Sequence, residues 1–244
     1  MRQEIFTILE NSFLTPDVCR VRLAGDTGAI TRPGQFVDLK LDGFFLRRPL
    51  SVCDWQEGEL TLLYKLQGGG TRALSRLAPG AQLDLLVGLG NGYDTAKSGA
   101  RPLLVGGGVG VPPLFALARR LLAEGKTPTA VLGFNREEEI LLADELTALG
   151  VRVLLATADG SRGVKGFVTD AMASLTDYTY VYTCGPEPML RAVYAASRTS
   201  GQFSFEERMG CGFGACMGCS CETKYGTKRI CRDGPVLEKE EIVW

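Results

Sequence analysis

Short runs in which apolar and polar residues alternate fill most of the first hundred positions. They cover residues 4–9, 35–41, 60–66 and 82–87, and Gly, Pro, Asn or Asp bounds most of them. A period of two is typical of half-buried β-strands, and several short strands separated by turns favour an antiparallel barrel or sandwich. The pattern predicts a small all-β domain over residues 1–98.

A different rhythm begins near residue 101. Apolar stretches at residues 103–105, 129–134, 152–156 and 178–183 alternate with helical segments near 114–122, 140–149 and 168–175. Strands that alternate with helices build βαβ units, in which a parallel sheet carries helices on both faces. The pattern predicts an α/β domain with a parallel sheet over residues 99–200.

The last part of the chain, residues 201–244, is too rich in glycine to form an ordinary core. Six glycines and five of the eight cysteines lie between Glu207 and Gly234. So small a segment buries too little apolar surface to be stable by itself. We therefore predict a third, small module that a metal centre or covalent links hold together.

Composition narrows the possible chemistry. The chain has 244 residues, a formal net charge of -1 and no histidine, which excludes histidine-based nucleophiles, His-ligated zinc and Rieske-type clusters. No apolar run approaches the roughly 18 residues that a membrane span needs. Charges near the first residue leave no room for an apolar signal core. We expect a cytoplasmic protein, in which clustered cysteines bind metal more often than they form disulfides.

The cysteine spacing in the third module is specific. Cys211, Cys216 and Cys219 follow a C-x4-C-x2-C pattern, and Cys231 comes eleven intervening residues later. This is the plant-type spacing of a [2Fe-2S] cluster, and the glycines let a tight loop turn its N-H groups toward sulfur. A four-cysteine zinc site and disulfides are the alternatives. Cys221 is two residues after Cys219, where simultaneous ligation is awkward, so we interpret it as a bystander.

Two segments of the first domain suggest a phosphate-bearing cofactor. An arginine and a hydroxyl residue are three positions apart in Arg48-Pro49-Leu50-Ser51, and Leu63-Tyr64-Lys65 precedes a glycine run that ends at Gly70-Thr71. Arginine can clamp a pyrophosphate, and N-H groups at the start of a helix, here near residues 72–77, favour an anion. A glycine-rich hairpin is the alternative for the second segment. Together the two segments fit FAD.

Two glycine-rich turns follow strands of the predicted α/β domain. The first contains Gly106, Gly107, Gly108 and Gly110, and the second contains Cys184, Gly185, Pro186 and Met189. Glycines let the main chain approach a dinucleotide, although the spacing is not that of a G-x-G-x-x-G fingerprint. A buried structural cysteine is the alternative for Cys184.

These segments resemble the ferredoxin-reductase family of FAD- and NAD(P)-dependent oxidoreductases. In that family R-x-Y-S binds flavin and phosphate, a G-x-x-S/T loop covers the pyrophosphate, and the cysteine of C-G-P-x-x-M lies near the nicotinamide. The resemblance implies that Arg48 and Thr71 hold the pyrophosphate. It also implies catalytic positions for Ser51, at the flavin, and Cys184, at the nicotinamide. Leu50 stands where the family commonly has an aromatic residue that stacks on the flavin.

The order of the three parts is similar to that of the dihydroorotate dehydrogenase B family of electron-transfer subunits. Residues 231–236, Cys-Arg-Asp-Gly-Pro-Val, resemble the C-x-D-G-P-V/I ending of that family. The resemblance implies FAD, [2Fe-2S] and NAD as cofactors, and electron transfer from an FMN-containing dihydroorotate dehydrogenase catalytic subunit to NAD+ in pyrimidine (UMP) biosynthesis. It further implies a heterotetramer with two copies of each subunit, and neither a nucleic-acid nor a membrane partner.

Other functions fit the same residues. The chain could be the flavin and iron-sulfur subunit of a sulfide dehydrogenase or of an NADH-dependent ferredoxin:NADP oxidoreductase, or a free-standing reductase. A non-catalytic iron-sulfur redox sensor is an alternative from another class. NAD and NADP are also not distinguished, because Arg136 could meet a 2'-phosphate or could simply be solvated.

Overall fold

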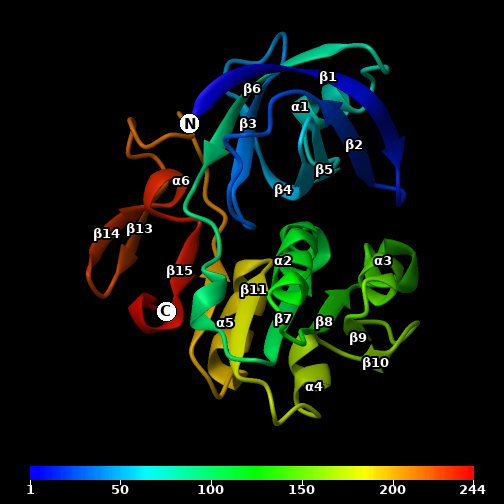
Figure 1. Cartoon of the computed structure of the whole chain (residues 1–244), viewed down its shortest axis with the longest axis vertical. Coiled ribbons are helices and arrows are strands. Elements are labelled where there is room, and N and C mark those ends of the chain that lie inside the picture. The colour runs from blue at the N-terminus through cyan, green and yellow to red at the C-terminus, as the bar shows by residue number, and fades with distance from the viewer.

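Six antiparallel strands at the N-terminal end close into a barrel. The computed structural model describes residues 1–244, and the barrel forms its upper part in Figure 1. The strand order around the barrel is β1-β2-β5-β4-β3-β6. The short helix α1 (Gly69–Leu74) connects β5 to β6. The strands are β1 (Arg2–Phe13), β2 (Val18–Ala24), β3 (Phe36–Lys40), β4 (Arg48–Gln56), β5 (Glu59–Lys65) and β6 (Gln82–Leu89).

The predicted alternation becomes the inside and outside of this barrel. Along β6, Leu83, Leu85 and Val87 are buried in the barrel core, whereas the residues between them are only partly buried. Successive side chains of a strand point to opposite faces, so every second residue fills the barrel. A closed barrel leaves no free strand edge, and the predicted all-β domain is confirmed as a barrel.

A seven-stranded sheet forms the lower part of the molecule. Its order is β10-β9-β8-β7-β11-β12-β15, and every neighbouring pair is parallel except β12 with β15. Helices α2 and α3 cover one face and α4 and α5 the other. The strands are β7 (Pro102–Gly107), β8 (Thr129–Phe134), β9 (Arg152–Thr157), β10 (Val164–Lys165), β11 (Tyr180–Cys184), β12 (Gly201–Ser204) and β15 (Val236–Glu238). The helices are α2 (Pro112–Ala123), α3 (Ala143–Ala148), α4 (Val168–Met172) and α5 (Glu187–Ala196).

The cysteine-rich module is inserted between two strands of this sheet. It contains the hairpin of β13 (Ser220–Thr223) and β14 (Gly226–Arg229) and the single-turn helix α6 (Ile230–Asp233). The sheet therefore continues past residue 200, where we divide the second and third parts. β12 precedes the module in the sequence and β15 follows it, and both strands belong to the sheet. Figure 1 shows the module beside both the barrel and the sheet.

Two predicted helices have different limits in the structure. The helix expected at 140–149 begins only at Ala143, because Leu142 has the left-handed backbone conformation (φ 60°), which a right-handed helix cannot include. The helix expected at 72–77 begins earlier, at Gly69, because the Thr71 hydroxyl accepts hydrogen bonds from the N-H groups of Gln67 (3.1 Å) and Gly68 (3.3 Å). Four 3-10 turns complete the fold: Thr95–Lys97, Gly108–Gly110, Glu137–Glu139 and Lys239–Glu241. None of the helices has the length and apolar character needed to cross a bilayer.

Candidate functional site: three loops at the junction of barrel, sheet and cysteine module

The flavin segment and the glycine run of the barrel lie against each other. The guanidinium of Arg48 rests on the main chain of Gly70, where a β-carbon would be 2.9 Å from Cζ of the arginine. The ring of Phe44 covers the same guanidinium, 4.9 Å from its centroid. Only a residue without a side chain permits this approach, so the two predicted phosphate-binding segments form one site.

Ser51 lies on the outer face of the barrel. It is half-buried in β4 and stands opposite Phe36 of β3. Directly opposed residues of an antiparallel pair share a face, and Phe36 packs with the sheet and the cysteine module. Leu50, at the position of the missing aromatic residue, packs against the barrel core instead.

The segment 63–65 splits between two faces of β5. Leu63 belongs to the apolar cluster shared by barrel and sheet, and Lys65 forms an ion pair with Asp17 (2.9 Å). The side chain of Tyr64 points the other way, into the barrel core, where its hydroxyl donates to Asn11 Oδ1 (2.8 Å). Strand alternation turns the side chain of Tyr64 inward, so only its main chain is available to the cofactor that we expect at this segment.

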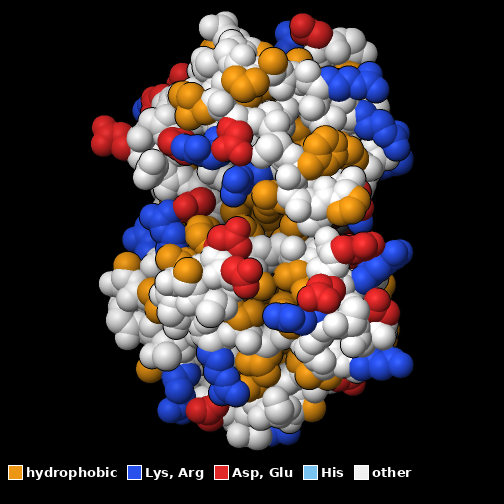
Figure 2. All heavy atoms as spheres, turned by 90° about the vertical axis from the view of Figure 1, so that its right-hand side faces the viewer, with side chains coloured by type: hydrophobic (Ala, Val, Ile, Leu, Met, Phe, Trp, Pro, Cys, Tyr) orange, Lys and Arg blue, Asp and Glu red, His pale blue; other side chains and the backbone are white.

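A recess separates the barrel from the sheet domain. Figure 2 shows it between the upper and lower halves of the molecule, with hydrophobic side chains at its base and charged side chains around it. Leu63 and Cys53 of the barrel and Leu114 of α2 belong to the apolar cluster that joins the two domains. An ion pair between Asp54 of β4 and Arg119 of α2 ties the same two elements.

The two glycine-rich turns of the sheet domain meet at the ends of neighbouring strands. β7 and β11 are adjacent and parallel, and Gly106 is paired with Cys184. A β-carbon on Gly107 would lie 2.5 Å from Sδ of Met189, and one on Gly110 would lie 2.6 Å from Cα of Gly185. Strand order reverses between β7 and β11, since the chain continues to β8 on one side and to β12 on the other. Doubly wound folds bind nucleotides at this switch point.

The thiol of Cys184 stays protonated in this environment. Burial raises its pKa to about 12, against a smaller opposing effect of the Ser204 hydroxyl. Ser204 is its partner on β12. Tyr93, in the segment that joins the two domains, donates from its hydroxyl to the carbonyl oxygen of Thr183 (3.1 Å). Cys184 can therefore act as a neutral group beside a cofactor but not as a thiolate nucleophile at neutral pH.

The four predicted cluster ligands form two pairs. The N-H of Cys216 donates to Sγ of Cys211 (3.5 Å), and the N-H of Cys231 donates to Sγ of Cys219 (3.4 Å). No group of three or more Cys, Asp or Glu side chains is arranged to hold one metal ion. A [2Fe-2S] cluster needs two cysteine ligands on each iron, whereas a zinc site needs four ligands around one ion. The arrangement therefore fits the two-iron cluster better.

Main-chain N-H groups point at the sulfur of Cys211. Burial by itself would raise the pKa of this thiol, but N-H groups of Cys216, Phe213 and Ala215 outweigh burial and lower the pKa to about 6. The N-H of Ala215 is 3.2 Å from the sulfur. Such donors stabilise a thiolate, the form that binds iron. Burial and the neighbouring Cys219 raise the pKa of Cys231 to about 12 in the metal-free arrangement.

Cys221 and Arg136 lie apart from these contacts. Cys221 is on β13, outside both cysteine pairs, and burial together with Glu207 and Glu222 raises its pKa. Arg136 is exposed and forms ion pairs with Glu138 (3.2 Å) and Glu139 (3.7 Å). Its positive charge is thus already matched by carboxylates.

Sequence reasoning missed Asp38. Its carboxylate is only 2% exposed and faces the cysteine loop at Gly212. Burial raises its pKa to about 7, with Arg47 opposing and Cys211 adding to the shift. In the alternating pattern of the predicted strand 35–41, a single acid reads as an ordinary solvent-facing residue. Only its pairing with Pro49 of the flavin segment could have drawn attention to it.

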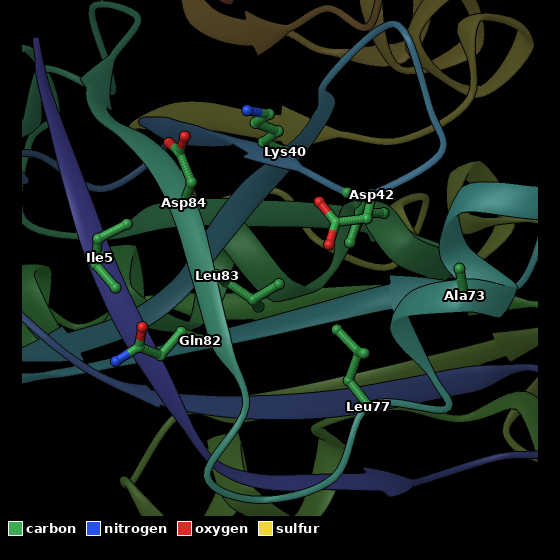
Figure 3. Close-up of a pocket in the computed structure, with 9 residues that line it drawn as sticks. Ile5, Lys40, Asp42, Ala73, Leu77, Gln82, Leu83 and Asp84 are labelled. Carbon is green, nitrogen blue, oxygen red and sulfur yellow. The ribbon is translucent and has the colours of Figure 1, made fainter.

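One pocket of the barrel lies away from these residues. It has a volume of about 290 Å³ and lies on β6 and the segments after β3 and α1, and none of the predicted site residues lines it. Figure 3 shows Asp42 and Leu77 extending into it from opposite sides. Its lining includes no arginine, no cysteine and no glycine, so it offers neither a phosphate clamp nor a cluster ligand.

Known families and structures match each part of this arrangement. Residues 104–195 match the oxidoreductase NAD-binding domain, and residues 206–243 match the iron-sulfur cluster binding domain of dihydroorotate dehydrogenase B. A solved structure described as an NADH-dependent reduced ferredoxin-NADP oxidoreductase is similar at 30% identity, with a TM-score of 0.89 over 98% of this chain and 90% of that one. The ferredoxin reductase of carbazole 1,9a-dioxygenase, at 22% identity, shares the fold (TM-score 0.71, 80% of this chain and 65% of that one).

Fold and site together define an NAD-linked flavin and iron-sulfur oxidoreductase of the ferredoxin-reductase class. Two curated relatives are "Dihydroorotate dehydrogenase B (NAD(+)), electron transfer subunit" proteins. The relative from Geobacillus sp. (strain WCH70) is 42% identical over 100% of this chain and 99% of its own length, and that from Shouchella clausii (strain KSM-K16) is 40% identical over 99% and 98%. The chain belongs to this family of electron transfer subunits of dihydroorotate dehydrogenase B. Its cofactors are FAD, a [2Fe-2S] cluster and NAD, and it works with a catalytic subunit.

Proposed function

We propose that this chain takes electrons from the FMN of a separate dihydroorotate dehydrogenase subunit and delivers them to NAD+ through a [2Fe-2S] cluster and FAD. We place the reaction in UMP biosynthesis in the cytoplasm, in a complex with two copies of each subunit. The names of the relatives support the partner, since each is an electron transfer subunit of a dihydroorotate dehydrogenase.

One observation carries the proposed order of the three electron carriers. The cysteine module packs on the barrel beside the flavin segment, because Phe36, opposite Ser51, shares an apolar cluster with Cys219 and Cys231. The nucleotide turns open at the ends of β7 and β11. A flavin at Arg48 and Ser51 would therefore lie between the iron-sulfur cluster and NAD.

Each predicted residue has a distinct task in this arrangement. Arg48 would clamp the pyrophosphate, and Ser51 would hydrogen-bond the flavin. The turns at 106–110 and 184–189 would hold the nicotinamide nucleotide, with Cys184 as a neutral thiol at its edge. Cys211, Cys216, Cys219 and Cys231 would hold the cluster. When bound, FAD supplies the exchange between one-electron and two-electron carriers.

Exposure of the cluster ligands supports a route to another protein. Cys216 is exposed, whereas Cys219 and Cys231 are buried against the sheet side. Phe213 (44% exposed) and Met217 (53% exposed) flank Cys216. The ligand pair that contains Cys216 therefore lies at the surface, where a second subunit can approach.

The test is a coupled assay. The isolated chain is expected to oxidise NADH with an artificial dye and to leave dihydroorotate unchanged. Adding an FMN-containing dihydroorotate dehydrogenase subunit from the same host should couple dihydroorotate oxidation to NAD+ reduction. Cys216→Ser should abolish this coupling and spare the dye activity, whereas Cys221→Ser should spare both. Oxidation of dihydroorotate by the isolated chain would refute the proposal.

A second candidate is the flavin and iron-sulfur subunit of an NADH-dependent ferredoxin:NADP oxidoreductase. The TM-score of 0.89 to such a structure favours it. The ion pairs of Arg136 with Glu138 and Glu139 oppose it at the nucleotide site, because carboxylates repel a 2'-phosphate. Turnover with ferredoxin but not with dihydroorotate would favour this candidate. A redox sensor predicts instead that NADH fails to reduce the flavin rapidly.

A further inference from the structure

A buried carboxylate lies at the seam between the barrel and the cysteine loop. Asp38 is in β3, two residues after Phe36, so both side chains point out of the barrel on the same face. Phe36 packs against the cysteine module. Asp38 is 2% exposed and stands opposite Pro49 of the flavin segment. It therefore contacts neither bulk water nor the barrel core.

The cysteine loop is pressed onto this carboxylate through a glycine. Gly212 directly follows Cys211 and has the left-handed backbone conformation (φ 76°). A β-carbon on Gly212 would collide with Oδ2 of Asp38 and would lie 3.1 Å from Cγ. Both the backbone conformation and the lack of space require glycine here. The loop therefore packs directly against Asp38 at Gly212.

The carboxylate is not fully neutralised by its neighbours. Its Oδ1 has no hydrogen-bond partner. Arg47 donates to the main-chain carbonyl of Asp38 (3.2 Å) and to Asp84, both at its carbonyl oxygen (3.0 Å) and at Oδ1 (3.0 Å). The nearest arginine is therefore committed to other acceptors. A buried carboxylate oxygen without a hydrogen-bond partner lowers the stability of the folded state, so other contacts of the fold must compensate for it.

We propose that Asp38 is a positioning residue that fixes the cluster-binding loop on the flavin barrel and lowers the reduction potential of the cluster. The inference rests on the proposed function. A cluster that accepts an electron becomes more negative, and a carboxylate on the adjacent loop residue disfavours that form. The electron is then more readily passed to the flavin than retained. Asp38 itself exchanges no electron in this role.

The test compares two isosteric variants of the purified, cluster-containing chain. Asp38→Asn keeps the shape and removes the charge. Asp42→Asn is the matched control, because Asp42 is an exposed carboxylate four residues later, in the connection that follows β3. The titration is run at about pH 9, where Asp38 is ionised because its pKa is about 7. Redox titration followed by electron paramagnetic resonance gives the midpoint potential without any turnover. Asp38→Asn is expected to raise the ratio of reduced to oxidised cluster about tenfold at a fixed potential, equivalent to about 59 mV for one electron. Asp42→Asn is expected to leave it unchanged.

A second variant keeps the test decisive if Asp38→Asn loses its iron. Gly212→Ala retains the carboxylate but pushes the loop away from it, and it should raise the same ratio and alter the resonance line shape. Wild-type potentials in both variants would overturn the inference. Absence of a [2Fe-2S] signal from the unmodified chain would instead refute the proposed function, so the two failures are distinguishable.

Discussion

The guanidinium of Arg48 lies against the main chain of Gly70. The rest of β4, a turn and the whole of β5 separate these two residues in the sequence. Arg48 opens β4, and Gly70 is the second residue of α1. The contact places a fixed positive charge next to the free N-H groups at the start of α1. These are the two elements that an anionic pyrophosphate requires.

Removing this arginine should weaken FAD binding. Arg48→Ala deletes a charge-assisted hydrogen-bonding group worth roughly 1.5 to 3 kcal/mol, which corresponds to about a tenfold to more than a hundredfold loss of affinity. Flavin release on dilution, followed by fluorescence, measures the effect. Arg72→Ala, at an exposed position of α1, is the control and should retain FAD. Full retention of flavin by Arg48→Ala would show that the arginine serves another role.

The cysteine pairs predict the metal content. Anaerobically purified protein should contain about two irons and two acid-labile sulfides per chain. Serine at Cys211, Cys216, Cys219 or Cys231 should remove most of this iron, whereas Cys221→Ser should leave iron content and visible spectrum unchanged. Stoichiometric zinc, or loss of iron in Cys221→Ser, would contradict the ligand assignment.

The raised pKa of Cys184 predicts slow alkylation. At pH 8 the folded thiol is almost entirely protonated, so iodoacetamide should modify it about a hundredfold more slowly than in urea, after allowing for the greater nucleophilicity of a more basic thiolate. Peptide mapping by mass spectrometry gives the rate for this residue alone. In the folded protein the rate should still be rising at pH 10, and a plateau near pH 9 would contradict a pKa of about 12.

The same pKa makes stability depend on pH with a definite sign. Between about pH 8.5 and pH 12 the unfolded chain releases the Cys184 proton and the folded chain keeps it. The folded state then binds more protons, so the free energy of unfolding falls as pH rises. Thermal unfolding of Cys184→Ala should show a shallower decline above pH 8.5 than the unmodified chain. Equal slopes would contradict the prediction.

The apolar cluster between barrel and sheet should carry much of the stability of both domains. Leu114→Ala removes a fully buried side chain of α2 and should lower the free energy of unfolding by about 2 to 5 kcal/mol in urea titrations. Leu149→Ala, at a position that is 37% exposed, should cost less than about 1 kcal/mol. A loss below about 1 kcal/mol at Leu114 would contradict the prediction.

Short sequence patterns predict those parts of the candidate site whose residues are neighbours in the sequence. The cysteine motif and the two glycine-rich turns are short segments, and the residues of each segment lie close together simply because they are near neighbours along the chain. The direction of the Tyr64 side chain does not follow from such a short pattern. Strand alternation shows that Tyr64 points away from Leu63 and Lys65, but only the closure of the barrel decides which of the two faces of β5 is inside. The antiparallel strand β15 covers only three residues, too few for a periodic signal.

Asp38 illustrates a second limit of sequence analysis. A single acid in a strand normally indicates the solvent face, and its burial arises only when a loop more than 170 positions later in the chain covers it. No pattern within one strand contains that information. Once the strand pairing is known, Asp38 can be recognised because it stands opposite Pro49 of the flavin segment.

The cysteine module begins after β12 and returns as β15, and these two strands are hydrogen-bonded neighbours. Both ends of the module are therefore anchored a single strand spacing apart, and Asn91 secures the returning end through both main-chain groups of Val236. A chain that loses its iron keeps both ends of the module fixed in the folded sheet, so the loss of entropy on closing this long loop does not have to occur again when the cluster is rebuilt. We therefore expect that a chain which has lost its cluster can take up iron and sulfide again while it stays folded.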